Sequence, residues 1–497
     1  MHRLIISRRL LWLSLASATL VGCASVGPDF KTPSEAPAER YTHAPVLSDT
    51  ASAPTAQGAA QSFSTEKTVA TDWWTAFGSA KLDDLIAQAL HNSPTLASAE
   101  ATLRQAQQNY KAQSGSTLYP KVSARLGASR NDTNSANIGQ NGESHIFNLY
   151  NANIDVTYNL DLFGGNRRSL EAYAAQADYQ GFQLAGARLT LAGNVVTTAI
   201  SQAQFTGQIE ATEAILQAQQ AQLDIARKRL ELGATAKLDV LSLQTQVEQT
   251  RASLPPLHNK LEQADHLLAV LIGKAPGAAD IPRFKLSDFT LPTRLPVVVP
   301  SELLRQRPDI QASTALLHVA TAQYGVAIAD VYPQINLSAG YGSQALTTGA
   351  LFGPSSVIWN LAGQLAQPLF NAGLKAGTHA AEANMQAVGA DYQQTVLTAF
   401  RNVADALRQL DNDALTLQAQ AAADASAQAS LDLTDQQNKL GAVSYLQLLT
   451  AQQQAQQARI GLISAQAARL ADSAALYQAM GGGVLTGDIS KTANATR

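Results

Sequence analysis

The feature that most constrains the fold of this chain is an internal duplication, in which matching motifs recur in the same order along two halves. The pairs are Pro94-Thr-Leu-Ala-Ser-Ala and Pro308-Asp-Ile-Gln-Ala-Ser, Tyr119-Pro120 and Tyr332-Pro333, Leu162-Phe163 and Leu369-Phe370, Leu232-Gly233-Ala234 and Leu440-Gly441-Ala442, and Gly273 and Gly481. The last two pairs have the same offset, since 441 − 233 and 481 − 273 both equal 208. This period is far too long for a solenoid unit, so the sequence predicts a duplicated half.

Each half predicts the same series of elements. A helix of roughly 25 residues ends at Tyr-Pro, two strands follow, a helix of about 65–70 residues runs to Leu-Gly-Ala, and a helix of about 40 residues returns. Apolar residues from Val240 to Leu271 step by three and four, which is typical of a coiled-coil seam, and Leu446 to Tyr477 form a similar ladder. Pro255-Pro256 predicts a kink near Ser253. A helix of 65 residues extends roughly 100 Å, several times the thickness of a bilayer.

The strand segments alternate apolar and polar side chains. Residues 150–162 place Ile154 and Val156 on one face and Asn153 and Asp155 on the other, and 122–129, 335–342 and 357–365 alternate in the same way. Such alternation fits a half-buried soluble sheet or the wall of a membrane barrel. Strands of about ten residues with mostly uncharged polar faces favour the barrel.

The first residues read as a targeting segment. Arg3, Arg8 and Arg9 precede the short apolar stretch 10–20, and Leu20-Val21-Gly22-Cys23 resembles the site at which a bacterial lipoprotein is cleaved and acylated. From this resemblance we expect Cys23, the only cysteine, to carry lipid. Residue 24 is Ala rather than Asp, which resembles the signal for sorting to the outer membrane. No later stretch approaches 18 apolar residues, so any membrane crossing is expected to use β-strands.

Four strands are too few to close a barrel. An open edge in lipid leaves unpaired N–H and C=O groups, each costing several kcal/mol, so the barrel must be shared between chains. Two chains give eight strands with a filled interior, whereas three give twelve and leave room for a passage.

Composition and motifs exclude several other functions. The net charge of −3 and the low charged fraction of 15% give no reason to expect a nucleic-acid partner. The eight histidines show no metal-ligand spacing, and neither a phosphate-binding loop nor a nucleophile elbow occurs. We therefore expect no enzyme activity, no cofactor and no metal site.

A set of motifs spread over nearly the whole mature chain resembles the outer-membrane factor family, the TolC-like channels, in its lipoprotein branch (NodT/OprM-like). The motifs are Val26-Gly27-Pro28-Asp29-Phe30, Asp72-Trp73-Trp74-Thr75-Ala76-Phe77-Gly78, Leu303-Leu304-Arg305-Gln306-Arg307-Pro308-Asp309-Ile310 and the two Leu-Gly-Ala turns. The resemblance implies an α+β membrane protein: a homotrimeric 12-stranded β-barrel, four strands per chain, continuous with a long α-helical barrel. It also implies a periplasmic adaptor and an inner-membrane pump as partners, in an efflux system that passes drugs or other small molecules outward.

The resemblance also assigns roles to the ends of the long helices. Docking of the adaptor falls on the two turns, Leu232, Gly233 and Ala234 and Leu440, Gly441 and Ala442. The periplasmic constriction falls on Leu446, with Gln447 and Thr450 where some relatives carry acidic residues, and with Asp239 at the position that matches Gln447 in the first half. Ordinary helix hairpins with Leu446 as a seam residue are the alternative.

The predicted domains are a signal peptide (1–22), a lipid-anchored tether (23–70), a first repeat (71–275), a linker (276–300), a second repeat (301–481) and a tail (482–497). The alternative function is a non-channel coiled-coil lipoprotein that bridges the envelope. The pair of two-strand segments distinguishes the two, because a bridging protein would carry compact β modules instead.

Overall fold

The computed structural model describes residues 25–33, 38–44, 48–66, 68–134 and 144–483. The chain forms two compact units, each built from three separate segments. We call Met1–Pro33, Thr102–Gln180 and Ser313–Tyr392 the sheet unit, and Ser34–Ala101, Gly181–Ala312 and Gln393–Arg497 the helical unit. Each unit therefore takes segments from both halves of the duplication.

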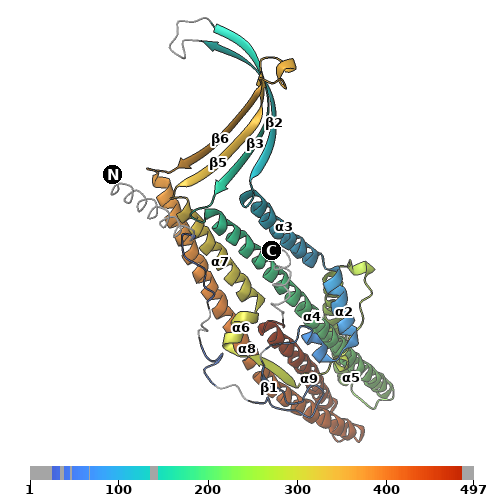
Figure 1. Ribbon diagram of the computed structural model, residues 1–497. Coiled ribbons are helices and arrows are strands. Elements are labelled where there is room, and N and C mark those ends of the chain that lie inside the picture. The colour runs from blue at the N-terminus through green and yellow to red at the C-terminus, as the bar shows by residue number, and fades with distance from the viewer. Residues whose placement is uncertain (1–24, 34–37, 45–47, 67, 135–143, 484–497) are drawn as a thin grey trace. The chain divides into compact units, whose positions relative to one another are not determined.

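The sheet unit contains a four-stranded antiparallel sheet (Figure 1). Its order is β2 (Lys121–Asn134), β3 (Ser144–Leu160), β5 (Gln334–Ala345) and β6 (Val357–Ala366). The short helix η5 (Thr348–Ala350) lies in the second hairpin. Each half contributes one hairpin, and the β3–β5 pairing joins the two halves, so the four predicted strands are confirmed.

The predicted bounds of β3 need correction. The strand begins at Ser144 rather than at Tyr150, because all fourteen residues of β2 pair with it. It ends at Leu160 rather than at Leu162, because the N–H of Leu162 turns back to donate to the carbonyl of Leu160 at 3.0 Å.

Strand register gives the sheet one apolar and one polar face. Ala124 lies opposite Ile154, Val156 opposite Ala339, and Ala339 opposite Leu361, so apolar residues meet across every strand pair. Polar residues meet on the other face, as Thr157 does with Ser338 and Asn159 with Asn336. The predicted division of the faces is therefore confirmed.

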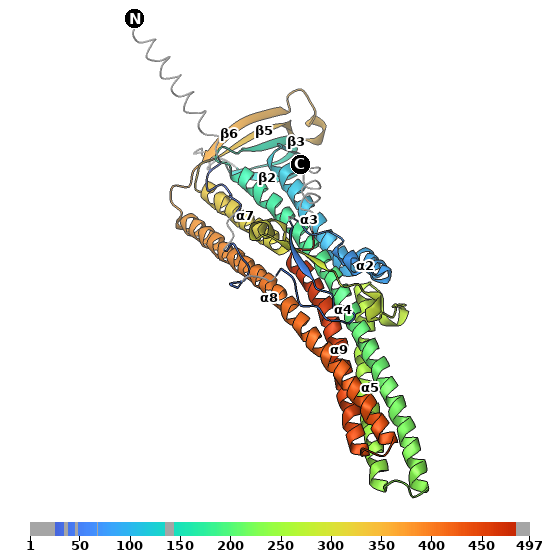
Figure 2. The same cartoon turned by 90° about the horizontal axis from the view of Figure 1, so that it is seen from below.

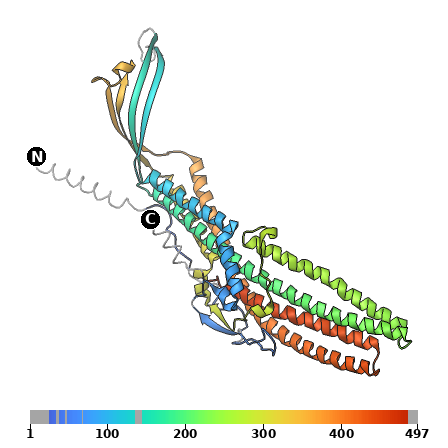
Figure 3. The same cartoon turned by 90° about the vertical axis from the view of Figure 1, so that its right-hand side faces the viewer.

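The long helices follow the predicted series in both halves. The first half forms α3 (Pro94–Thr117), α4 (Gly165–Glu231) and α5 (Lys237–Leu271), and the second forms α7 (Pro308–Ala329), α8 (Ala372–Lys439) and α9 (Tyr445–Ala479). The pairs α4–α5 and α8–α9 run antiparallel (Figure 3). The returning helices have 35 residues each instead of about 40. They begin at Lys237 and Tyr445, three residues after the Leu-Gly-Ala turns, and they end two residues before Gly273 and Gly481, which adopt positive φ.

The predicted seam of α5 is largely buried, and Leu243, Val247 and Leu268 are enclosed. Near the proline pair the seam opens, and Leu254 and Leu257 are only half-buried. The helix remains continuous through Pro255 and Pro256, and both prolines are exposed, so water can reach the carbonyl groups they leave unpaired. The angle of the predicted kink stays a prediction.

The remaining elements belong to the helical unit. They are β1 (Ser62–Glu66), η1 (Trp73–Phe77), α2 (Ala80–Asn92), η3 (Pro276–Ala278), η4 (Leu286–Asp288), β4 (Arg294–Val298) and α6 (Pro300–Gln306). Strand β1 pairs in parallel with β4, and neither strand was predicted. None of the helices in the described ranges is both long and apolar enough to cross a membrane.

Candidate functional site: the helix-pair tips

The two Leu-Gly-Ala turns have nearly the same geometry. Gly233 has φ +72° and Gly441 has φ +74°, a conformation that favours glycine. The N–H of Ala234 donates to the carbonyl of Arg229 at 2.8 Å, and the N–H of Ala442 donates to the carbonyl of Gln437 at 2.9 Å. Each turn therefore ends its helix with the same six-to-one hydrogen bond, and the positions next to each glycine are open rather than crowded.

Each turn presents an apolar side chain to solvent. Leu232 is 83% exposed and Leu440 is 85% exposed. The helix termini satisfy their own backbone groups, so these leucines are not needed to complete the turns. Two exposed leucines at equivalent positions are suited to contact with another protein.

The two turns lie at the same end of the helical unit (Figure 2). The guanidinium of Arg229, before the first turn, donates to the Tyr445 hydroxyl, after the second, at 3.2 Å. Behind this contact a buried apolar cluster joins α4, α5 and α9, and it includes Leu223, Leu243 and Leu449. The tips are therefore held together as one surface, which we call the tip surface (residues 229–239 and 440–450).

Leu446 points away from the core of the helical unit. It is 71% exposed, whereas Leu448 and Leu449, on the same turn of α9, are buried. The ladder of the sequence analysis placed Leu446 in a seam with Leu449, but only Leu449 packs in this protomer. The side chain of Leu446 is consequently available for contacts outside this core.

The other predicted gate residues make local contacts. Ser444 caps α9, because its hydroxyl accepts from the N–H of Gln447 while its own N–H donates to Gln447 Oε1 at 3.0 Å. The Thr450 hydroxyl donates to the carbonyl of Leu446 at 3.0 Å. In the first half, the hydroxyl of Thr235, which precedes α5, donates at 3.1 Å to Oδ2 of Asp239 in the first turn of that helix.

The capping role of Gln447 was readable from the sequence but was not predicted. Ser444 followed three residues later by Gln447 is the capping-box pattern. The pair fixes where α9 begins, and it therefore fixes how far Leu446 lies from the turn.

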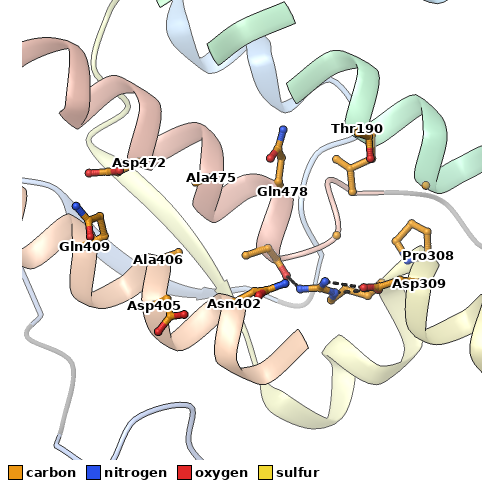
Figure 4. A pocket seen from close by; sticks show the side chains of 15 residues that line it. Thr190, Pro308, Asp309, Asn402, Asp405, Ala406, Gln409, Asp472, Ala475 and Gln478 are labelled. Carbon is orange, nitrogen blue, oxygen red and sulfur yellow. Dashed lines mark hydrogen bonds and ion pairs between the residues drawn. The ribbon is translucent and has the colours of Figure 1, made fainter. Parts of the chain in front are cut away.

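A second feature of the helical unit is a cavity of about 530 Å³ between α4, α8, α9 and the start of α7 (Figure 4). Asp472 of α9 and Gln409 of α8 line one part of it. In another part, Arg307 forms a bidentate ion pair with Asp309, with its shorter contact at 2.6 Å, and donates to the carbonyl of Ala479 at 2.8 Å. Arg307 thereby ties the start of α7 to the C-terminal end of α9, where a cation is favoured.

Asp472 titrates unusually. Burial, together with a hydrogen bond to Asp413 and the charge of that carboxyl group, raises the pKa of Asp472 to about 8, although Arg469 lowers it. Arg469 itself is fully buried and donates to Gln61 Oε1 at 2.7 Å. Over the described residues, no three His, Cys, Asp or Glu side chains are placed to hold a metal ion.

The model of the family described as "Outer membrane efflux protein" matches residues 85–274 and 299–482, which is most of the chain. The chain belongs to the outer membrane efflux protein family. The predicted resemblance to the outer-membrane factors is therefore confirmed, and this efflux protein is a member of a transport family.

Curated relatives are similar along much of the chain. The toluene efflux pump outer membrane protein TtgC of Pseudomonas putida is 31% identical over 483 residues, covering 96% of both proteins. The cation efflux system protein CusC of Escherichia coli is 30% identical over 421 residues, covering 83% of this chain and 88% of CusC. This efflux protein is accordingly an outer-membrane channel component of a tripartite efflux system.

Solved structures share the fold. The outer-membrane channel OprN matches with a TM-score of 0.84 and 26% identity, covering 93% of this chain and 99% of OprN. The Campylobacter jejuni outer-membrane channel CmeC matches with the same TM-score of 0.84 at 20% identity, covering 95% of this chain and 98% of CmeC, and supports the fold alone. The fold of the efflux protein is the α+β channel fold of these structures.

The motifs that carry the resemblance fasten the N-terminal part of the efflux protein to its helices. The buried guanidinium of Arg168 contacts Asp29 Oδ1 at 2.6 Å, and Phe30 stacks on His318 with ring centroids 4.2 Å apart. In the helical unit, Trp73 stacks on Tyr477 at 5.4 Å. Cys23 lies outside the described residues.

Proposed function

We propose that three copies of this efflux protein form one channel. Each copy contributes its four-stranded sheet to a 12-stranded β-barrel and its long helices to an α-helical barrel. The observation that carries this proposal is the open sheet: among the strands of the described residues, β2 and β6 each have a neighbour on one side only. Unpaired backbone groups in lipid cost several kcal/mol each, and pairing with a further copy removes that cost.

The apolar face of the sheet is proposed to face lipid, and the face that carries Asn153 and Asp155 is proposed to line the passage. Uncharged and polar residues suit a water-filled lumen, whereas Ile154 and Val156 suit acyl chains. A solitary coiled-coil lipoprotein, the alternative function, would leave both this face and the two sheet edges without a partner.

Cys23 is proposed to carry the lipid anchor. The described part of the chain begins at Ser25. The N–H of Val26 donates to the carbonyl of Phe163 at 3.0 Å, at the base of the sheet. A lipid on Cys23 would therefore leave the fold next to the strands that are proposed to enter the membrane.

The tip surface is proposed to be the periplasmic gate and docking site. Leu232, Gly233 and Ala234 and their equivalents Leu440, Gly441 and Ala442 would contact a periplasmic adaptor, which links the channel to an inner-membrane pump. Leu446 from three copies would converge on the threefold axis as a ring that excludes water by dewetting. Gln447 and Thr450 carry no charge, so the second half adds no carboxylate ring there, and Asp239 is the acidic residue nearest the gate.

The cargo is proposed to be drugs or other small molecules. Relatives are named for toluene, pyoverdine, antibiotic and cation efflux, so the family accepts chemically different cargoes. We also propose the domain division of the sequence analysis: a signal peptide, a tether, two repeats joined by a linker, and a tail.

Native mass spectrometry of the complete protein, extracted from outer membranes, tests the assembly and the anchor together. We expect a mass of three chains, each carrying lipid on Cys23. Cys23→Ser should remove the lipid mass and leave the trimer, because barrel burial is a separate driving force. A one-chain or two-chain mass would contradict the trimer, and an unmodified mature Cys23 would contradict the anchor.

A further inference from the structure

One aromatic stack closes the base of the sheet between the two halves of the chain. Phe163 follows β3 and stacks on Tyr332, which precedes β5, with ring centroids 4.8 Å apart and an interplanar angle of 24°. Because β3 and β5 are hydrogen-bonded neighbours, the stack sits at the foot of their pairing. It is one of the contacts that join repeat to repeat inside one copy.

The same two residue types stand at the outer edges of the sheet. In the duplication Phe370 corresponds to Phe163, and Tyr119 corresponds to Tyr332. Phe370 follows the edge strand β6 and is 94% exposed, and Tyr119 precedes the other edge strand β2 and is 66% exposed. Within the described residues neither ring has an aromatic neighbour at stacking distance.

We infer that Phe370 of one copy stacks on Tyr119 of the next copy, and that this contact fixes the register of β6 against β2 of that copy. The inference rests on the proposed trimer and names the contact that joins its subunits. The occupant is a second copy of this chain, because the chain already contains the same junction between its own halves.

The duplication gives the register. Inside one copy Tyr158 lies opposite Leu337. Adding the offset 370 − 163 to the number of Tyr158 gives its counterpart Leu365. Subtracting the offset 332 − 119 from the number of Leu337 gives its counterpart Ala124. Leu365 is therefore placed opposite Ala124 of the next copy, and apolar residues again meet apolar residues.

Other registers are disfavoured for separate reasons. A slip of one residue would place the apolar face of one sheet next to the polar face of the other. A slip of two residues preserves the faces but moves the strands by about 7 Å, which is more than the separation of stacked rings. The aromatic stack therefore selects one register among those that the alternation of apolar and polar residues alone would permit equally.

The equivalence holds at the base of the sheet and not along the whole hairpins. Lys121 pairs with Thr157 in the first hairpin. Its counterpart Gln334 pairs with Ala366, which is two residues beyond the counterpart of Thr157. The inference accordingly depends on Phe163, Tyr332 and their counterparts, and its test uses positions close to them.

Disulfide trapping in the complete protein tests the register. Directly opposed residues of antiparallel strands have Cα atoms about 4.5–5.5 Å apart, within reach of a disulfide. Leu365→Cys with Ala124→Cys should give covalent trimers on non-reducing gels that collapse with reductant. Few covalent trimers are expected from the two slipped registers, which pair Leu365→Cys with Val122→Cys or with Leu126→Cys. Each single-cysteine variant is the control for reaction of Cys23.

The outcomes separate this inference from the proposed function. Stronger trapping by either slipped pair would overturn the register. Trimers by native mass without trapping by any pair would overturn β6–β2 pairing while leaving the trimer intact. Absence of trimers by native mass would overturn the proposed function itself.

Substitution of the ring tests the stack. Phe370→Ala should lower the temperature at which detergent-resistant trimers dissociate, and Phe370→Tyr should restore it. Phe352→Ala is the matched control, because Phe352 is 79% exposed in the β5–β6 hairpin, away from the base. If Phe370→Ala behaves like the parent protein, or no worse than Phe352→Ala, the proposed stack is absent.

Discussion

Burial inside the helical unit changes the chemistry of a carboxyl group on α9. In the unfolded chain Asp472 ionises near its ordinary pKa of 3.8, whereas in the folded chain burial raises the pKa to about 8. At a pH between these two pKa values, folding requires uptake of a proton by Asp472. The contribution of Asp472 therefore lowers the free energy of unfolding as pH rises from about 4 to 8, and above pH 8 the free energy of unfolding stays lowered by the full amount. Below pH 4 the group is protonated in both states and contributes no such loss.

Asp472→Asn should therefore stabilise the protein at high pH only. Asparagine cannot ionise and retains a donor for Asp413. We expect the thermal midpoint to rise by about 2 °C or more at pH 8 and to change little at pH 4, as measured by circular dichroism. Asp405→Asn is the control, because Asp405 lines the same cavity with a side chain that is 74% exposed. An equal gain at both pH values would show that the ionisation of Asp472 is not the cause.

Residue-scale features show where sequence reasoning stops. Arg469 lies on a helix rich in Ala and Gln, where a charged side chain is expected to be solvated, yet it is fully buried against the 50–61 segment. Only tertiary contacts made over some 400 residues of chain place it there. The role of Gln447, in contrast, depended on a four-residue pattern that was present in the sequence and was overlooked.

At the scale of elements, the sequence predicted the helices and strands that are determined by local periodicity. Alternation gave the four strands of the sheet, and the Leu-Gly-Ala turns gave the ends of α4 and α8. Strands β1 and β4 were missed because each has five residues and pairs with a segment more than 200 residues away. The early start of β3 was missed because its pairing with β2 extends beyond the alternating part.

The orientation of the strands makes a prediction at this scale. Ile154→Asp should place a charge against acyl chains near the middle of the bilayer, at a cost of up to a few kcal/mol, whereas Asn153→Asp should be tolerated on the lumen face. The measurement is the yield of detergent-resistant trimers in the outer membrane. We expect a large loss for the first variant and a small one for the second. Equal losses would mean that the two faces are assigned wrongly.

At the scale of the whole molecule, the duplication accounts for the architecture of one chain and for the way in which copies are proposed to assemble. One chain repeats a hairpin and a helix pair, and the edges that remain open match the junction that is already closed inside it. Sequence reasoning anticipated the repeats but not the interleaving of their segments in two compact units. Which segments pack together is decided by long-range contacts, and no local pattern records them.

The proposed gate connects the proposed assembly to transport. Leu446 lies five residues after Gly441, which places it about 8 Å from the turn along α9. Its exposure in the protomer leaves it available to form an apolar ring with two further copies. Serine at this position would remove the apolar barrier without disturbing the capping pair of Ser444 and Gln447.

Single-channel current through the Leu446→Ser protein in planar bilayers tests the central claim most directly. We predict that the parent trimer conducts little and that Leu446→Ser conducts in clear, uniform steps. Leu470→Ser, at a fully buried position higher on α9, should destabilise the protein without opening it. A Leu446→Ser protein that assembles as a trimer, inserts and still conducts no more than the parent would contradict the claim that the tips close the channel at this residue.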